Sequence, residues 1–155
     1  MITESVVHST ITIERTYPAA PERVFAAWAD PKRKRRWFAE GEGWSVLQFD
    51  LDFREGGRET AIFRDDKNGA EIRNDGHYED IVPGRRIVVA YTMSVGGRRI
   101  SASLGTVELR PQADGTRLVY TEQGAFFDGA DGPRMREQGW RELLDRLADQ
   151  LQTPG

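Results

Sequence analysis

Residues 133–152 read PRMREQGWRELLDRLADQLQ, a stretch whose apolar side chains recur at helical spacing. One face of the helix that this spacing predicts carries Arg136, Trp140, Leu143, Leu144, Leu147 and Leu151. The opposite face carries Glu142, Asp145, Arg146 and Asp149, so the helix is long and amphipathic. Such a helix stabilises a protein only by packing its apolar face against another element.

The residues before this helix alternate with a period of two, which is typical of strands. The expected strands are 11–17, 46–53, 58–64, 70–81, 85–93, 98–110 and 116–126. Short connections rich in Gly, Pro and Asp favour antiparallel pairing of neighbours. A curved antiparallel sheet of about seven strands therefore has one apolar face, and the C-terminal helix is expected to cover it.

Two short helices are expected after the first strand. Pro21 is tolerated in a first helical turn, and Val24 and Trp28 follow at helical spacing. Asp30 caps a second helix that runs to Trp37 and Phe38. Its basic run, Lys32, Arg33, Lys34, Arg35 and Arg36, is expected on an exposed face rather than in a nucleic-acid or lipid site.

The length and charge of the chain argue against several classes of protein. The 155 residues predict one domain over 1–155, with 1–9 flexible and 153–155 a tail. The 22 basic and 25 acidic residues give a formal charge of −3, which argues against nucleic acid as a partner. No apolar run approaches the ~20 residues that span a bilayer, so no membrane partner is expected and the protein is expected to be cytoplasmic.

Local patterns along nearly the whole chain resemble one family. They are APERVFAAWADP at 20–31 with Trp37, DFREGG at 52–57, GHYEDI at 76–81 with Pro83 and 86–88, residues 116–118 and 121–124, and Gly139-Trp140 with Leu143, Leu144 and Leu147. In this order they resemble the START-like or Bet v 1-like superfamily, and within it proteins similar to the C-terminal domain of the heat-shock-protein ATPase activator. The resemblance implies an α+β helix-grip fold, but relatives of this fold include lipid carriers, cyclases and a co-chaperone domain.

Glu122 and Arg136 are the most informative charged residues. Glu122 continues the apolar parity of Leu118 and Tyr120, the face expected to meet the C-terminal helix. Arg136 lies one turn before Trp140 on the apolar stripe. A buried charge must be paired, so the two residues form an internal ion pair or the polar end of a cavity, or else both are wet at an open rim.

Several aromatic residues are expected to line a ligand cavity between sheet and helix. The expected cavity residues are Trp28, Phe63, Tyr78, Tyr91, Ala102, Leu104, Tyr120, Glu122, Arg136, Trp140 and Leu144. The leading interpretation is a protein that binds a small hydrophobic or amphipathic ligand there. A chaperone-ATPase interaction module is the alternative, and the oligomeric state could be monomer or homodimer.

Catalysis is the least favoured interpretation. It would use His77, Glu122 or a tyrosine as acid or base, and His77 is more simply an exposed residue at the start of a strand. With no cysteine and one suitable histidine, the sequence signals no metal site. We therefore expect no catalytic residue, no metal and no cofactor.

Overall fold

The computed structural model describes residues 5–130 and 132–152. Its elements in chain order are β1 (Val6–Tyr17), α1 (Pro21–Ala29), α2 (Pro31–Lys34), the π-helical turn η1 (Arg35–Ala39), β2 (Trp44–Leu51), β3 (Arg58–Asp65), β4 (Glu71–Val82), β5 (Arg86–Val95), β6 (Arg98–Gln112), β7 (Gly115–Phe127) and α3 (Pro133–Gln152). This described part of the chain has the α+β helix-grip arrangement that the sequence predicts.

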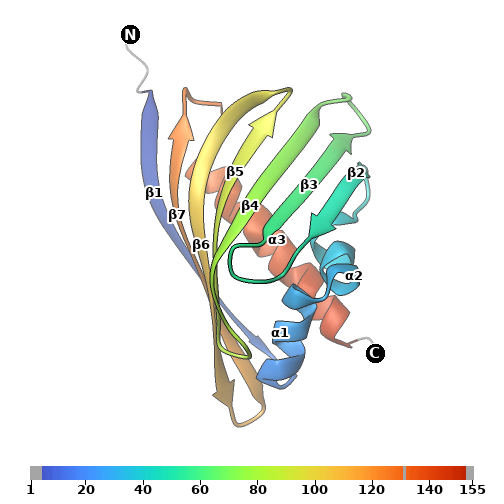
Figure 1. Cartoon of the computed structure of the whole chain (residues 1–155), viewed down its shortest axis with the longest axis vertical. Coiled ribbons are helices and arrows are strands. Elements are labelled where there is room, and N and C mark those ends of the chain that lie inside the picture. Colours follow the sequence, from blue (N-terminus) through green and yellow to red (C-terminus); the bar gives the residue numbers. More distant parts are fainter. Residues whose placement is uncertain (1–4, 131, 153–155) are drawn as a thin grey trace.

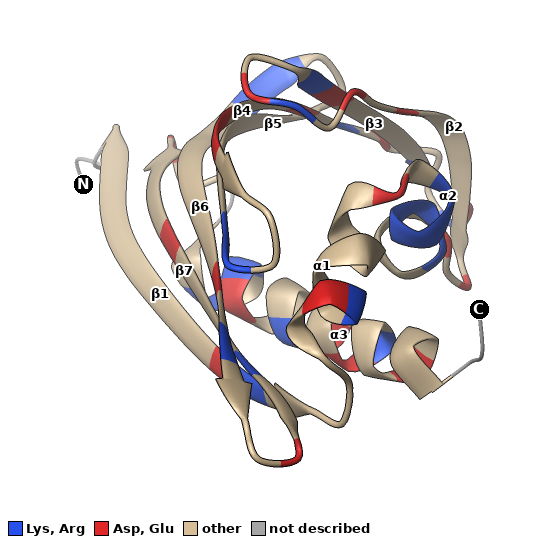
Figure 2. Ribbon diagram, turned by 60° about the horizontal axis from the view of Figure 1, so that its bottom comes forward, with Lys and Arg blue, Asp and Glu red and all other residues tan. Residues whose placement is uncertain are grey.

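The strands form one antiparallel sheet in the order β1-β7-β6-β5-β4-β3-β2. Each strand from β2 to β7 therefore pairs with its neighbour in the chain, and β1 closes the order beside β7. Register shifts in the β2–β3, β4–β5 and β5–β6 pairs accompany the curvature of the sheet. The sheet curves around the helices, and α3 crosses its concave face (Figure 1, Figure 2). We call this concave side the inner face and the opposite side the outer face.

A proline and a side-chain cap determine where the two short helices begin. Pro21 opens α1 in the first turn, and the Asp30 carboxylate caps α2 by accepting a hydrogen bond from the Lys32 backbone N–H at 3.0 Å. The Trp37 indole N–H donates to the Ala27 carbonyl at 2.9 Å. This bond holds η1 against α1, so the helical segment packs as one unit beside α3 (Figure 1).

The main core lies between α3, α1 and the inner face of the sheet. Leu144 and Leu147 of α3 are fully buried, and Ile13 of β1 and Leu118 of β7 are at most 1% exposed. The Tyr17 hydroxyl donates to the Leu144 carbonyl at 2.9 Å, which fixes β1 to the middle of the helix. Within the described residues, the helices are all too short or too polar to cross a bilayer.

The first strand is longer than expected. It begins at Val6, and His8 pairs with Ala125 of β7, so the expectation of flexibility is wrong for residues 6–9. These residues are ordered because β7 offers a partner along its whole length. Residues 1–4 and 153–155, also expected to be flexible or a tail, lie outside the described residues.

Removing the Leu147 side chain tests the packing of α3. Leu147→Ala should lower the free energy of unfolding by about 2–5 kcal/mol, because it leaves a cavity in the core. Met135→Ala is the matched control on the same helix, since Met135 is 72% exposed and its loss should change stability by less than about 0.5 kcal/mol. Urea unfolding of both variants measures the difference. Equal effects would contradict the observed placement of α3.

Candidate functional site

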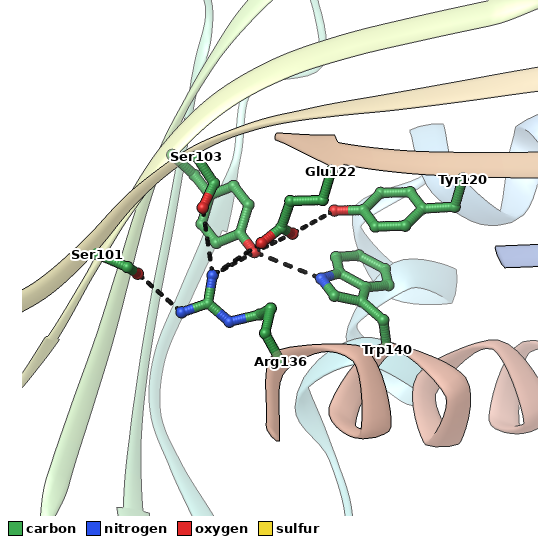
Figure 3. Close-up of polar contacts among 7 residues, drawn as sticks. Ser101, Ser103, Tyr120, Glu122, Arg136 and Trp140 are labelled. Atoms are coloured by element: carbon green, nitrogen blue, oxygen red, sulfur yellow. Dashed lines mark hydrogen bonds and ion pairs between the residues drawn. The ribbon is translucent and has the colours of Figure 1, made fainter. Parts of the chain in front are cut away.

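A buried ion pair joins α3 to the sheet. The Arg136 Nη1 lies 2.9 Å from the Glu122 Oε2, and the two side chains are 6% and 0% exposed. Arg136 comes from the first half of α3 and Glu122 from β7 (Figure 3). The structure therefore has the internal pair, and the interpretation of both residues as wet at an open rim is wrong.

Neutral side chains complete the hydrogen bonding of both charges. The hydroxyls of Tyr91 and Tyr120 both donate to the Glu122 Oε1, at 2.5 and 2.7 Å. The Arg136 guanidinium donates to the Tyr91 hydroxyl at 3.0 Å, and to the hydroxyls of Ser101 and Ser103 at 2.7 and 3.3 Å (Figure 3). The Trp140 indole N–H donates a hydrogen bond to the Tyr91 hydroxyl at 3.4 Å. We call these seven residues the Arg136 network.

Strand alternation explains how β6 and β7 supply this network. Tyr120 and Glu122 are two residues apart on β7, so both point to the inner face. Gly105 of β6 pairs with Glu122, and a Cβ at Gly105 would lie 2.8 Å from the Tyr120 hydroxyl. The absence of a side chain at Gly105 therefore leaves the space in which the Tyr120 hydroxyl reaches Glu122.

The tyrosine hydroxyls of the network are neutral donors at neutral pH. Burial is the largest cause that raises the pKa of Tyr91, and the Glu122 carboxylate raises it further. Burial likewise raises the pKa of Tyr120, with Tyr91 and Glu122 acting in the same direction. Both hydroxyls therefore keep the protons that they donate to Glu122.

Ala102 and Leu104 do not belong to this site, which corrects the prediction from sequence. They alternate with Ser101 and Ser103, whose hydroxyls meet Arg136 on the inner face. Ala102 and Leu104 therefore point to the outer face, where they share a shallow depression of about 650 Å³ with Thr10, Gln123 and Ala125.

A second buried ion pair involves Lys34, which corrects its expected exposure. Its Nζ lies 2.6 Å from the Glu59 Oε1, and the side chains are 4% and 8% exposed. The Tyr78 hydroxyl donates to the same oxygen at 2.8 Å. Lys34 lies three residues before the buried Trp37 and so on the same helical face, a signal that could have found it.

Aromatic rings join the two ion pairs. Trp140 stacks on Tyr120 at 4.1 Å between ring centroids and on Trp28 at 6.0 Å. The Phe38 ring centroid lies 6.1 Å from that of Trp140 and 6.5 Å from that of Phe63. The Lys34 Nζ is 4.6 Å from the centre of the Phe38 ring. The predicted Trp28 and Phe63 thus lie in the same inner region as Trp140. The predicted Tyr78 joins this region through the Lys34 pair, and the predicted Leu144 is part of the fully buried core.

The inner face of β4 and β5 is covered less completely than the core. On β5, Ile87 is buried, while Val89, Tyr91 and Met93 on the same face are only half-buried. Asn74 of β4 pairs with Met93 and faces the same side. Its Oδ1 is buried and has no hydrogen-bond partner among the described residues. The sequence analysis missed Asn74, although its position four residues before Tyr78 on the same strand is a signal that could have found it.

The remaining candidates for chemistry lie elsewhere. The His77 side chain is 48% exposed beside Glu79, and its neighbour Tyr78 is the residue that points inward, so its interpretation as exposed is confirmed. Among residues 5–130 and 132–152, no group of three or more His, Asp or Glu side chains could hold a metal ion.

An antiparallel sheet that grips a C-terminal helix, with a buried polar network between them, defines a START-like protein of the helix-grip class. The chain belongs to the Activator of Hsp90 ATPase homolog 1-like protein family, whose model matches residues 18–152. No curated protein matches the chain.

Solved bacterial structures share the whole fold. A protein from Rhizobium loti is 54% identical with a TM-score of 0.87, covering 95% of this chain and 99% of its own. A protein from Rhizobium leguminosarum is 44% identical with a TM-score of 0.91, covering 96% and 97%. One from Chromobacterium violaceum is 30% identical with a TM-score of 0.76, covering 94% and 99%. The similarity extends over nearly the full length of each.

A double-mutant cycle tests the Arg136 network. Arg136→Met should cost about 3–5 kcal/mol of stability, because it leaves the Glu122 carboxylate buried without its partner. Adding Glu122→Gln should restore much of the loss, since the two residues are coupled. Urea unfolding gives all three values.

The exposed pair Arg141–Glu137 on the same helix is the matched control. Arg141→Met should change stability by no more than about 1 kcal/mol, because water screens this pair. A loss on Arg136→Met as small as the loss on Arg141→Met would contradict the buried pair.

Alkaline titration tests the burial of the tyrosines. The chain has four, and the pKa of each is raised above its ordinary value of 10.0, chiefly by burial. The folded state favours the protonated form, so this contribution to stability is complete below pH 10.0 and is lost as pH rises toward the folded pKa. Phenolate absorbance should therefore appear only together with unfolding. In urea all four should ionise near the ordinary value, and a tyrosine that ionised there in the folded protein would contradict the structure.

Proposed function

We propose that the protein binds a small hydrophobic or amphipathic molecule between α3 and the inner face of β4 and β5, without covalent chemistry. The observation that carries this proposal is the incomplete cover over the inner side of β5. Val89 and Met93 are half-buried there, although the same face of the sheet is fully buried at Ile87. A ligand in this position would remove their apolar surface from water.

The neighbouring groups suit binding better than catalysis. Glu122 and Glu59 are each held by a cation and by tyrosine hydroxyls, so neither is poised to take a proton from a substrate. His77, the histidine that catalysis would use, lies on the exposed side of β4. Polar groups that are already paired can orient a ligand at the edge of an apolar surface.

A second candidate function is contact with a chaperone ATPase, as the family name suggests for its relatives. Trp44 and Leu47 favour it, because they are 39% and 46% exposed on the edge strand β2. Exposed apolar residues on an edge strand suit a protein partner. A chaperone ATPase assay with Trp44→Ala tests this role, and the same variant should leave ligand binding unchanged.

An uncharged fluorescent dye tests ligand binding. N-phenyl-1-naphthylamine should bind the native protein with a stoichiometry near one and change the emission of Trp140, which lies beside Tyr91. Met93→Trp should abolish binding, because Met93 faces inward opposite Ser101 and the larger ring would occupy the site. Fluorescence titration measures both effects.

Ala102→Trp is the matched control, since it adds the same ring to the outer face of the same sheet. It should leave dye binding unchanged. Absence of dye binding to the unmodified protein, or equal effects of the two substitutions, would remove the support for a ligand site on the inner face.

A further inference from the structure

Asn74 carries an unsatisfied polar atom on the inner face. Its Oδ1 is buried, yet it accepts no hydrogen bond from any described residue. Its neighbours across the sheet are Ala61, which is fully buried and apolar, and Met93. A buried carbonyl oxygen that accepts no hydrogen bond costs stability, so the unpaired Asn74 Oδ1 requires an explanation.

The tyrosine hydroxyls of the two networks on this face are already engaged. The Tyr91 hydroxyl donates to Glu122 and accepts from Arg136 and Trp140, which uses its whole hydrogen-bonding capacity. The Tyr78 hydroxyl donates to Glu59 and accepts from Lys34. The Trp28 indole N–H is also buried without a partner among the described residues, but Trp28 lies on α1 against the rings of Trp37 and Trp140. Asn74 lies on the half-covered strands, where its oxygen is left for a ligand.

The charges around this face cancel in pairs. Arg136 is matched by Glu122 at 2.9 Å, and Lys34 by Glu59 at 2.6 Å. A charged ligand would lose its hydration without meeting an opposite charge, which disfavours its binding. An uncharged polar group needs only one hydrogen-bond partner, and the Asn74 amide can accept or donate.

We propose that Asn74 is the specificity-determining residue of the site and that the ligand is an uncharged molecule with an apolar body and a hydroxyl or amide group. This inference rests on the proposed function. The apolar body lies against Val89, Met93 and the rings near Trp140. Its hydroxyl or amide group hydrogen-bonds to the Asn74 side chain.

Three probes of the same shape test the inference: naphthalene, 2-naphthol and 2-naphthoate. With the unmodified protein, 2-naphthol should bind roughly fivefold more tightly than naphthalene, the gain that one hydrogen bond gives. The anion 2-naphthoate should bind at least about tenfold more weakly than 2-naphthol, because its charge has no partner. Dissociation constants come from calorimetric titration.

Asn74→Leu should remove the preference for 2-naphthol over naphthalene while naphthalene still binds. Gln123→Leu is the matched control, since Gln123 is an exposed side-chain amide whose neighbours in the sheet, Thr10 and Leu104, lie on the outer face. It should leave the preference unchanged. If Asn74→Leu does not fold, the side-chain amide NMR signal of Asn74 in the unmodified protein gives the answer, because 2-naphthol should shift it and naphthalene should shift it less.

The outcomes separate this inference from the proposed function. Failure of all three probes to bind would overturn both. Equal binding of naphthalene and 2-naphthol, or a preference that survives Asn74→Leu, would overturn the role of Asn74 and leave the apolar site in place. Tighter binding of 2-naphthoate than of 2-naphthol would overturn the uncharged class of ligand.

Discussion

The buried guanidinium of Arg136 constrains how the C-terminal helix packs on the sheet. Arg136 enters the core from α3, and its charge is tolerated there only because Glu122 and neutral oxygens surround it. Those oxygens come from β5, β6 and β7, so α3 can pack in one position only if three strands are in the correct register. The Arg136 network thus couples the position of the helix to the pairing of the strands. Apolar contacts alone would allow more than one position of the helix, because they are not directional.

The Lys34 pair plays a similar part for the other side of the fold. It joins α2 to β3 and, through Tyr78, to β4. Trp140 and Phe38 lie between the two pairs, within 6.1 Å of each other. The inner face therefore has a neutral polar network at each end and aromatic rings between them, while β4 and β5 remain partly uncovered.

The sequence predicts the fold well because its main signals are periodic. The stripe that includes Leu144 and Leu147, and the parity of Tyr120 and Glu122, both place residues on the buried face correctly. The same reasoning fails on β6, where the apolar residues change parity between Leu104 and Val107. Periodicity favours Leu104 as the buried residue, but Arg136 requires the hydroxyls of the alternate positions. The inward orientation of Asn74 follows from the alternation of β4, since Asn74 lies four residues before Tyr78, but alternation could not show that its Oδ1 has no partner.

The internal pairing of charges also determines what a ligand can contribute. Neither Arg136 nor Lys34 needs a counter-charge from outside, so the folded protein is complete without a bound anion. Binding of the proposed ligand would then draw mainly on the apolar surface that it covers, about 0.8 kcal/mol for each buried CH₂ group. Affinity should consequently follow the apolar size of the ligand and respond little to salt, because no net charge is neutralised in the complex. The proposed hydrogen bond to Asn74 would add little to affinity but would decide the choice between ligands of equal size.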